Sequence, residues 1–169
     1  MIASVHLIVG ATVGAICAHS AQKAPYKFST PLLVEWFALG SVICALGLYS
    51  HFLCDFNNHS EYRQFEWWVL PLVLYIDLRI AIVLARYLFN KKYSPTDRAC
   101  VAAGIFWASV PDGIFWSHEL FGFSSAWTQA IQNVHQAIHV PAPSEGIFNQ
   151  LVIVLVSAWL LQRILPHPT

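Results

Sequence analysis

Charged residues are scarce in this chain of 169 residues. They make up 11% of the sequence, hydrophobic residues make up 57%, and the mean hydropathy is +0.55. A soluble globular domain has about 25% charged residues, so the composition predicts a membrane protein. Nine basic residues balance nine acidic ones, and no basic run is long enough to follow a phosphate backbone. Nucleic acid is therefore excluded as a partner.

The chain also lacks paired cysteines. Its four cysteines lie far apart, form no CxxC motif and occupy or border apolar segments: Cys17, Cys44, Cys54 and Cys100. Thiols in such positions identify neither a disulfide framework nor a cellular compartment. The first apolar run has no basic segment before it and no clear small-residue cleavage site after it. We therefore expect this run to be a retained membrane span.

Five apolar segments approach the roughly 20 helical residues that cross a bilayer core about 30 Å thick. They are approximately Ile2–Ser20, Pro31–Cys54, Trp67–Phe89, Ala99–Phe123 and Gly146–Leu165. The loop SSAWTQAIQNVHQAIHVPAPSEG should contain a short helix closed by Pro141 and Pro143. We predict an all-α fold, in which residues 1–169 form a single domain. It is an integral membrane bundle of about five transmembrane helices with one short helix in an outer loop.

The distribution of positive charge predicts the topology, because short cytoplasmic loops are enriched in Lys and Arg. Basic residues cluster in the first and third connectors and near the C-terminus: Lys23, Lys27, Lys91, Lys92, Arg98 and Arg163. The N-terminus should then be outside and the C-terminus cytoplasmic, in a prokaryotic cell membrane. Six of the eight histidines fall on the outer side: His6, His51, His59, His118, His135 and His139.

The stretch SHFLCDFNNH, residues 50–59, ends the second apolar segment with metal-binding residue types. Residues four apart share a helix face, so His51 and Asp55 can point at one site, and His59 can extend the stripe. His135 and His139 have the same spacing. Imidazole and carboxylate groups suit zinc, manganese or iron. The alternative is that these polar groups only cap and solvate a helix end.

The fourth apolar segment contains ASVPDGIFWSHELFG. Pro111 and Gly113 should interrupt the helix around Asp112 and leave backbone groups that line a cavity. If helical geometry resumes, Asp112 and Glu119 share a face, and His118 lies about 100° from Glu119. The alternative is a proline kink in which Asp112 bonds the freed amides.

Asp77 and Arg79 lie near the middle of the third apolar segment. Positions two apart do not face each other on a helix, so each needs another partner. Asp77 is a candidate to orient a ligand histidine, and Arg79 is a candidate to hold an anionic substrate. Pairing with other helices is an equal alternative.

SHFLCDFNNH, followed by FEWWVLP, resembles the membrane-bound metal-dependent hydrolase family that includes YdjM-like proteins. That family is distantly related to zinc-dependent phospholipase C and P1 nuclease, helical proteins that bind metals through His and Asp. The matching positions are His51, Asp55, His59, His6 in HLIVGATVG and Asp112 in VPDG. The PD motif here follows the HxxxD motif instead of preceding it. VHQAIH would supply the histidines of a missing HRGxTHS segment.

These patterns together predict a membrane-embedded, metal-dependent hydrolase that acts at the outer face, among membrane lipids, on a phosphoester of a lipid or lipid-linked substrate. The candidate ligands of a divalent ion are His6, His51, Asp55, His59, Asp112, His118, His135 and His139. Zinc is favoured, with manganese or iron as alternatives, and the ion would lower the pKa of a bound water. Glu119 is the candidate general base.

Two other functions remain open from the sequence. The first is a haem-binding electron-transfer subunit in which His51 and His118 are axial ligands, although aspartates beside the histidines suit a hard divalent ion better. The second is a non-catalytic subunit of a membrane assembly. The oligomeric state does not follow from the sequence.

Overall fold

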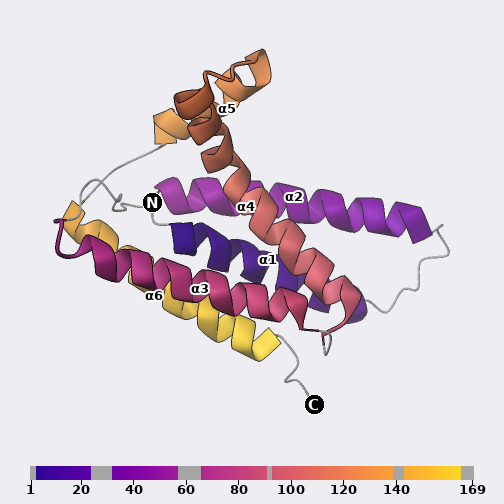
Figure 1. Ribbon diagram of the computed structural model, residues 1–169. Helices are drawn as coiled ribbons and strands as arrows, with labels where there is room; N and C mark the ends of the chain where they lie inside the picture. The colour runs from indigo at the N-terminus through magenta and orange to yellow at the C-terminus, as the bar shows by residue number, and fades with distance from the viewer. Residues whose placement is uncertain (1–2, 24–31, 57–65, 91–92, 139–142, 165–169) are drawn as a thin grey trace.

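The regular secondary structure in the described part of the chain is all α-helix, with no strand, as predicted (Figure 1). In this computed structural model, residues 3–23, 32–56, 66–90, 93–138 and 143–164 are described. The helices are α1 (Ala3–Lys23), α2 (Leu32–Phe56), α3 (Leu70–Phe89), α4 (Pro95–Phe121), α5 (Ala126–Ile138) and α6 (Pro143–Ile164). Each predicted apolar segment therefore contains one of these helices, and α5 is the short helix predicted between the last two.

Three helices in the described residues are long and apolar enough to cross a membrane: Ser4–Lys23, Glu35–Asp55 and Pro95–His118. The third predicted segment, in α3, carries Asp77, Arg79 and Arg86. In α6 the described apolar stretch, Phe148–Ile164, is shorter. Length and composition alone therefore support three membrane spans. The prediction of about five spans is not supported by these two criteria for α3 and α6.

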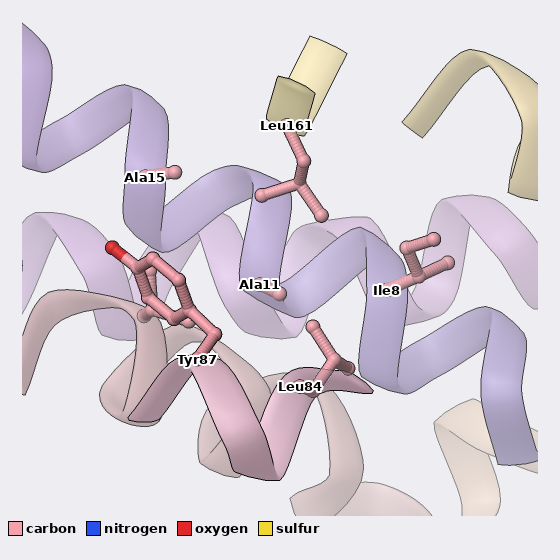
Figure 2. Packing of buried hydrophobic residues seen from close by; sticks show 7 residues of the cluster. Ile8, Ala11, Ala15, Leu84, Tyr87 and Leu161 are labelled. Carbon is pink, nitrogen blue, oxygen red and sulfur yellow. The ribbon is translucent and has the colours of Figure 1, made fainter. Parts of the chain in front are cut away.

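Helix α1 is the centre of the fold, because it packs against α2, α3, α4 and α6. Apolar side chains are buried around its circumference, among them Val5, Cys17 and Ala18. A helix that is apolar on all sides is expected at the interior of a bundle. Figure 2 shows one side of this core, formed by Ile8, Ala11, Ala15, Leu84, Tyr87 and Leu161.

The closest helix contact is between α1 and α4, and it depends on glycine. A Cβ atom added to Gly14 would overlap the backbone of Cys100, and one added to Gly104 would overlap the carbonyl of Gly10. Small residues allow helix backbones to approach closely, as in the Gly-x-x-x-Gly pairs of membrane helices. Gly10 and Gly14 have this spacing. Because neither has a side chain, α4 can pack directly against the backbone of α1.

The helix directions bring several ends together. In Figure 1 the C-terminal end of α2 lies at the left with the N-terminal ends of α1, α3 and α6. Helix α4 crosses α1 and packs on both α1 and α2, while α5 packs on α2 and α4. The polar residues near the start of α1 and the end of α2 therefore lie at one end of the bundle.

Helix α4 continues without interruption through Pro111, so the predicted break around Asp112 is wrong. Proline removes one backbone N–H, which leaves the carbonyl of Trp107 without its intrahelical donor. Pro111 is fully buried, and packing against α1 and α2 holds the helix together across it. The local helix-breaking preference is thus overridden by tertiary contacts.

Candidate metal centre

Four side chains from three helices converge on one point. They are His6 of α1, His51 and Asp55 of α2, and Asp112 of α4, and their potential ligand atoms all lie within 4.8 Å of one another. His6, His51 and Asp55 are 2%, 0% and 1% exposed, whereas Asp112 is 34% exposed. The group is therefore buried within the bundle and reaches the surface at Asp112. It could hold a metal ion.

His51 and Asp55 share a face of α2, as their spacing predicts. His51 Nε2 lies 3.0 Å from Asp55 Oδ2. Asp55 is in the last turn of α2, where carbonyl groups lack partners and the helix dipole is negative. A carboxylate there neither caps the helix nor interacts favourably with its dipole, and the burial of Asp55 prevents it from solvating the helix end. The alternative reading of this pair as a solvated cap does not fit Asp55.

His6 and Asp112 complete the group from the other two helices. His6 Nε2 lies 3.6 Å from Asp55 Oδ1 and 3.4 Å from Asp112 Oδ2. His51 Nε2 lies 3.9 Å from Asp112 Oδ1. Ligand atoms placed tetrahedrally around zinc at about 2.1 Å would be about 3.4 Å apart. The observed separations bracket that value, so the residues present fit a small divalent ion.

The hydrogen bond of His51 determines which of its nitrogens faces the group. His51 Nδ1 lies 2.8 Å from the carbonyl oxygen of Ala108. A carbonyl oxygen only accepts, so Nδ1 carries the hydrogen, and a neutral ring then has its lone pair on Nε2. That lone pair is 3.0 Å from a carboxylate oxygen of Asp55, an arrangement that requires a proton or a cation between them. Metal-binding histidines are commonly oriented by such a carbonyl.

Asp77 accepts a hydrogen bond from the backbone N–H of Ser4, at 3.2 Å, and both residues are buried. Ser4 is in the first turn of α1, two residues before His6. A carboxylate beside exposed N–H groups stabilises a helix N-terminus. Asp77 was predicted to orient a ligand histidine, and that role stays a prediction; the bond described here holds the end of the helix that carries His6.

Arg79 lies on a different side of the bundle from the metal group. It lines a cavity of about 670 Å³ together with Ile8 of α1 and residues of α3 and α6. Ile8 is two residues beyond His6 and so points about 160° away from it around α1. Arg79 was predicted to hold an anionic substrate, and this stays a prediction; its side chain lines a cavity separate from the metal group.

The structure does not bring His118 into the group. Because α4 continues as a helix, His118 lies about 9 Å further along its axis than Asp112 and about 120° around it. Glu119 is in α4 and His135 is in α5, but their side chains are outside the described part of the structure. His59 and His139 lie outside the described residues, so their predicted roles remain predictions.

The carbonyl of Ala108 is the contributor that the sequence could not indicate, since a backbone group carries no residue-type signal.

No protein-family model matches the chain, and comparisons with curated proteins and with solved structures also give no match. The resemblance of SHFLCDFNNH to the metal-dependent hydrolases therefore stays a prediction. The functional assignment depends on the geometry of His6, His51, Asp55 and Asp112.

Proposed function

We propose that this protein is an integral membrane hydrolase in which His6, His51, Asp55 and Asp112 bind a divalent metal ion. One observation carries the proposal: His51 Nε2 lies 3.0 Å from Asp55 Oδ2 while its Nδ1 is engaged by the carbonyl of Ala108. A shared cation accounts for that contact. Two imidazoles and two carboxylates suit zinc, with manganese or iron as alternatives.

The opening of the group at Asp112 favours a catalytic site over a closed structural one. Four protein ligands fill the tetrahedral positions of zinc, so a catalytic ion here would take water or substrate as a fifth ligand or in place of Asp112. A divalent ion supplies a water of lowered pKa and neutralises charge on a transferring group. Asp112 is the partly exposed member of the group, so a substrate would reach the ion from its side. Glu119, two turns further along α4, remains the proposed general base.

The surroundings of the group favour a lipid or lipid-linked phosphoester as the substrate. Helix α5 packs on α2 and α4, which carry three of the four ligands. It buries the polar side chains of Thr128 and Gln132 against the protein, and it exposes Trp127 and Val134. A helix with its apolar side outward fits the interfacial layer of a bilayer. Lipid head groups would then have direct access to the region of Asp112.

The predicted spans α3 and α6 are also proposed to face lipid. Both expose large apolar side chains: Leu72, Leu74, Tyr75, Leu78, Val83, Phe148, Leu151, Leu155, Val156 and Trp159. Contiguous apolar surface of this kind indicates contact with lipid or with another protein. With α1, α2 and α4, these two helices would complete the five-span bundle.

Haem is a poorer fit to this site than a small ion. The haem alternative takes His51 and His118 as axial ligands, but His118 does not lie in the group, and the ring of His51 is stacked on that of His6, with centroids 4.2 Å apart and planes inclined by 24°. Axial imidazoles must lie on opposite faces of a macrocycle, and Asp55 and Asp112 occupy the space beside these rings. The proposal therefore retains the divalent ion and not the haem alternative.

The proposed function is tested on protein purified without chelators. We expect about one divalent ion per chain by elemental analysis and metal-dependent hydrolysis of bis(p-nitrophenyl) phosphate or of a phospholipid. Removal of the ion with a chelator should abolish turnover, and zinc, manganese or iron should be compared for its recovery. Metal-free protein, or bound metal without hydrolysis of any phosphoester, would contradict the proposal and favour a non-catalytic subunit.

The proposed topology can be tested by labelling single cysteines in a cysteine-free background. A cysteine at Gln129, exposed on α5, should react with a membrane-impermeant reagent from outside the cell. A cysteine at Ser20, exposed near the end of α1, should react only after permeabilisation. Labelling of both positions from the same side would contradict the proposed topology.

A further inference from the structure

The cavity beside Arg79 lies on the side of α1 away from the metal centre. It has a volume of about 670 Å³ and is lined mainly by apolar side chains of α3 and α6, such as Ile80, Val83 and Val154. Leu84 and Leu161 also line it, and Figure 2 shows both pointing toward α1. Cavities of this size commonly bind small molecules. The proposed function makes no use of it.

Two arginines enter this mostly apolar lining. Arg79 and Arg86 are seven residues apart on α3, so they share a face and are separated by about 10 Å along the axis. Neither guanidinium forms an ion pair or hydrogen bond with any residue that the structure describes. A cation beside apolar surface in a membrane is costly unless an anion accompanies it. Guanidinium groups match phosphate oxygens particularly well.

Apart from Arg79, the polar residues of the cavity are concentrated at one end. Asn90, which follows α3, and Gln162, in the last turn of α6, line the same end as Arg86. Toward the N-terminal ends of α3 and α6, the side chains that line the cavity are apolar except for Arg79. The cavity is therefore amphipathic, with donors for an anionic group along α3 from Arg79 to Asn90 and apolar side chains of α3 and α6 beside them for a hydrocarbon chain.

We propose that this cavity binds an anionic phospholipid. Its phosphate group would lie between Arg79 and Arg86, and an acyl chain would follow the apolar side chains of α3 and α6. The site is independent of the proposed hydrolase activity, because α1 separates it from His6, His51 and Asp55.

The test uses the full-length protein in detergent, titrated with phosphatidylglycerol or with phosphatidylcholine, and bound lipid is counted by native mass spectrometry. We expect phosphatidylglycerol to bind at least about tenfold more tightly, because its net charge is negative and that of phosphatidylcholine is zero. Arg86→Gln and Arg79→Gln should each weaken it about tenfold. Arg163→Gln is the matched control, since Arg163 stacks on Trp159 at 5.7 Å and does not line the cavity.

A second variant tests whether the lipid occupies the cavity. Val83 is exposed on α3 and lines the cavity between Arg79 and Arg86, so Val83→Trp should fill the space of the bound lipid without disturbing the core. We expect it to prevent phosphatidylglycerol binding while metal content stays unchanged. Equal binding of the two lipids, unchanged binding by the Arg79→Gln/Arg86→Gln double variant, or equally strong binding of inorganic phosphate alone would overturn the proposal.

Discussion

Replacing Asp55 by asparagine is expected to abolish stoichiometric metal binding while the protein still folds. The carboxylate is 1% exposed and lies within 3.6 Å of His6 Nε2 and 3.0 Å of His51 Nε2, so it is the anionic centre of the group. Asparagine keeps the shape and loses the charge. Changes to groups that merely orient a ligand cost about 10–100-fold in metal affinity, and loss of a ligand should cost at least as much. His51→Gln should behave similarly.

Matched variants separate metal loss from general damage. Asp97→Asn changes another buried carboxylate, which accepts a hydrogen bond from Gln22 at 2.6 Å far from the metal group. His118→Gln changes a histidine on the same helix as Asp112. Both should retain the parent metal content in elemental analysis. If Asp55→Asn and His51→Gln both kept full metal content, SHFLCDFNNH would be only the end of a helix and not a metal-binding segment. The proposal of a hydrolase would then lose its main support.

Alanine at Gly14 is expected to destabilise the protein by about 1–3 kcal/mol, a typical cost of overpacking. The added Cβ would meet the backbone of Cys100 and Val101, which cannot move aside as a flexible side chain can. Gly104→Ala should act in the same way, because its Cβ would meet the backbone of Gly10. Thermal unfolding in detergent measures the loss.

The control variant for this prediction is expected to change stability in the opposite direction. Gly40 and Gly113 lie in α2 and α4, and a Cβ added to either meets no atom within 4 Å. Alanine in an open helical position is favoured over glycine by about 0.5–1 kcal/mol. Gly40→Ala should therefore be neutral or stabilising. If Gly14→Ala and Gly40→Ala had equal effects, the close approach of α1 and α4 would be wrong.

The α1–α4 contact also links stability to the metal group. His6 is on α1 and Asp112 is on α4, and their side chains are 3.4 Å apart. An alanine that separates the two helices should lengthen this distance and weaken metal binding. Metal affinity measured on Gly14→Ala should consequently fall, whereas Gly40→Ala should leave it unchanged.

The sequence by itself determined the features that depend on neighbouring residues. Apolar segments of span length predicted the helices, and turn residues predicted the short α5. The i, i+4 spacing placed His51 and Asp55 on one face, because helical periodicity is a local property. The sequence also singled out His6 and Asp112 as candidates, but through a resemblance and a topology argument and not through local geometry.

Only the tertiary structure decided which of these candidates meet. Glycine packing between α1 and α4 places Asp112 beside His6, and the unbroken helix through Pro111 carries His118 away from them. Burial overrode the helix-breaking preference of proline, which is a local tendency of a few kcal/mol. The Ala108 carbonyl orients His51, and α1 separates Arg79 from the metal group. Such contacts join residues far apart in the chain, so no local pattern encodes them.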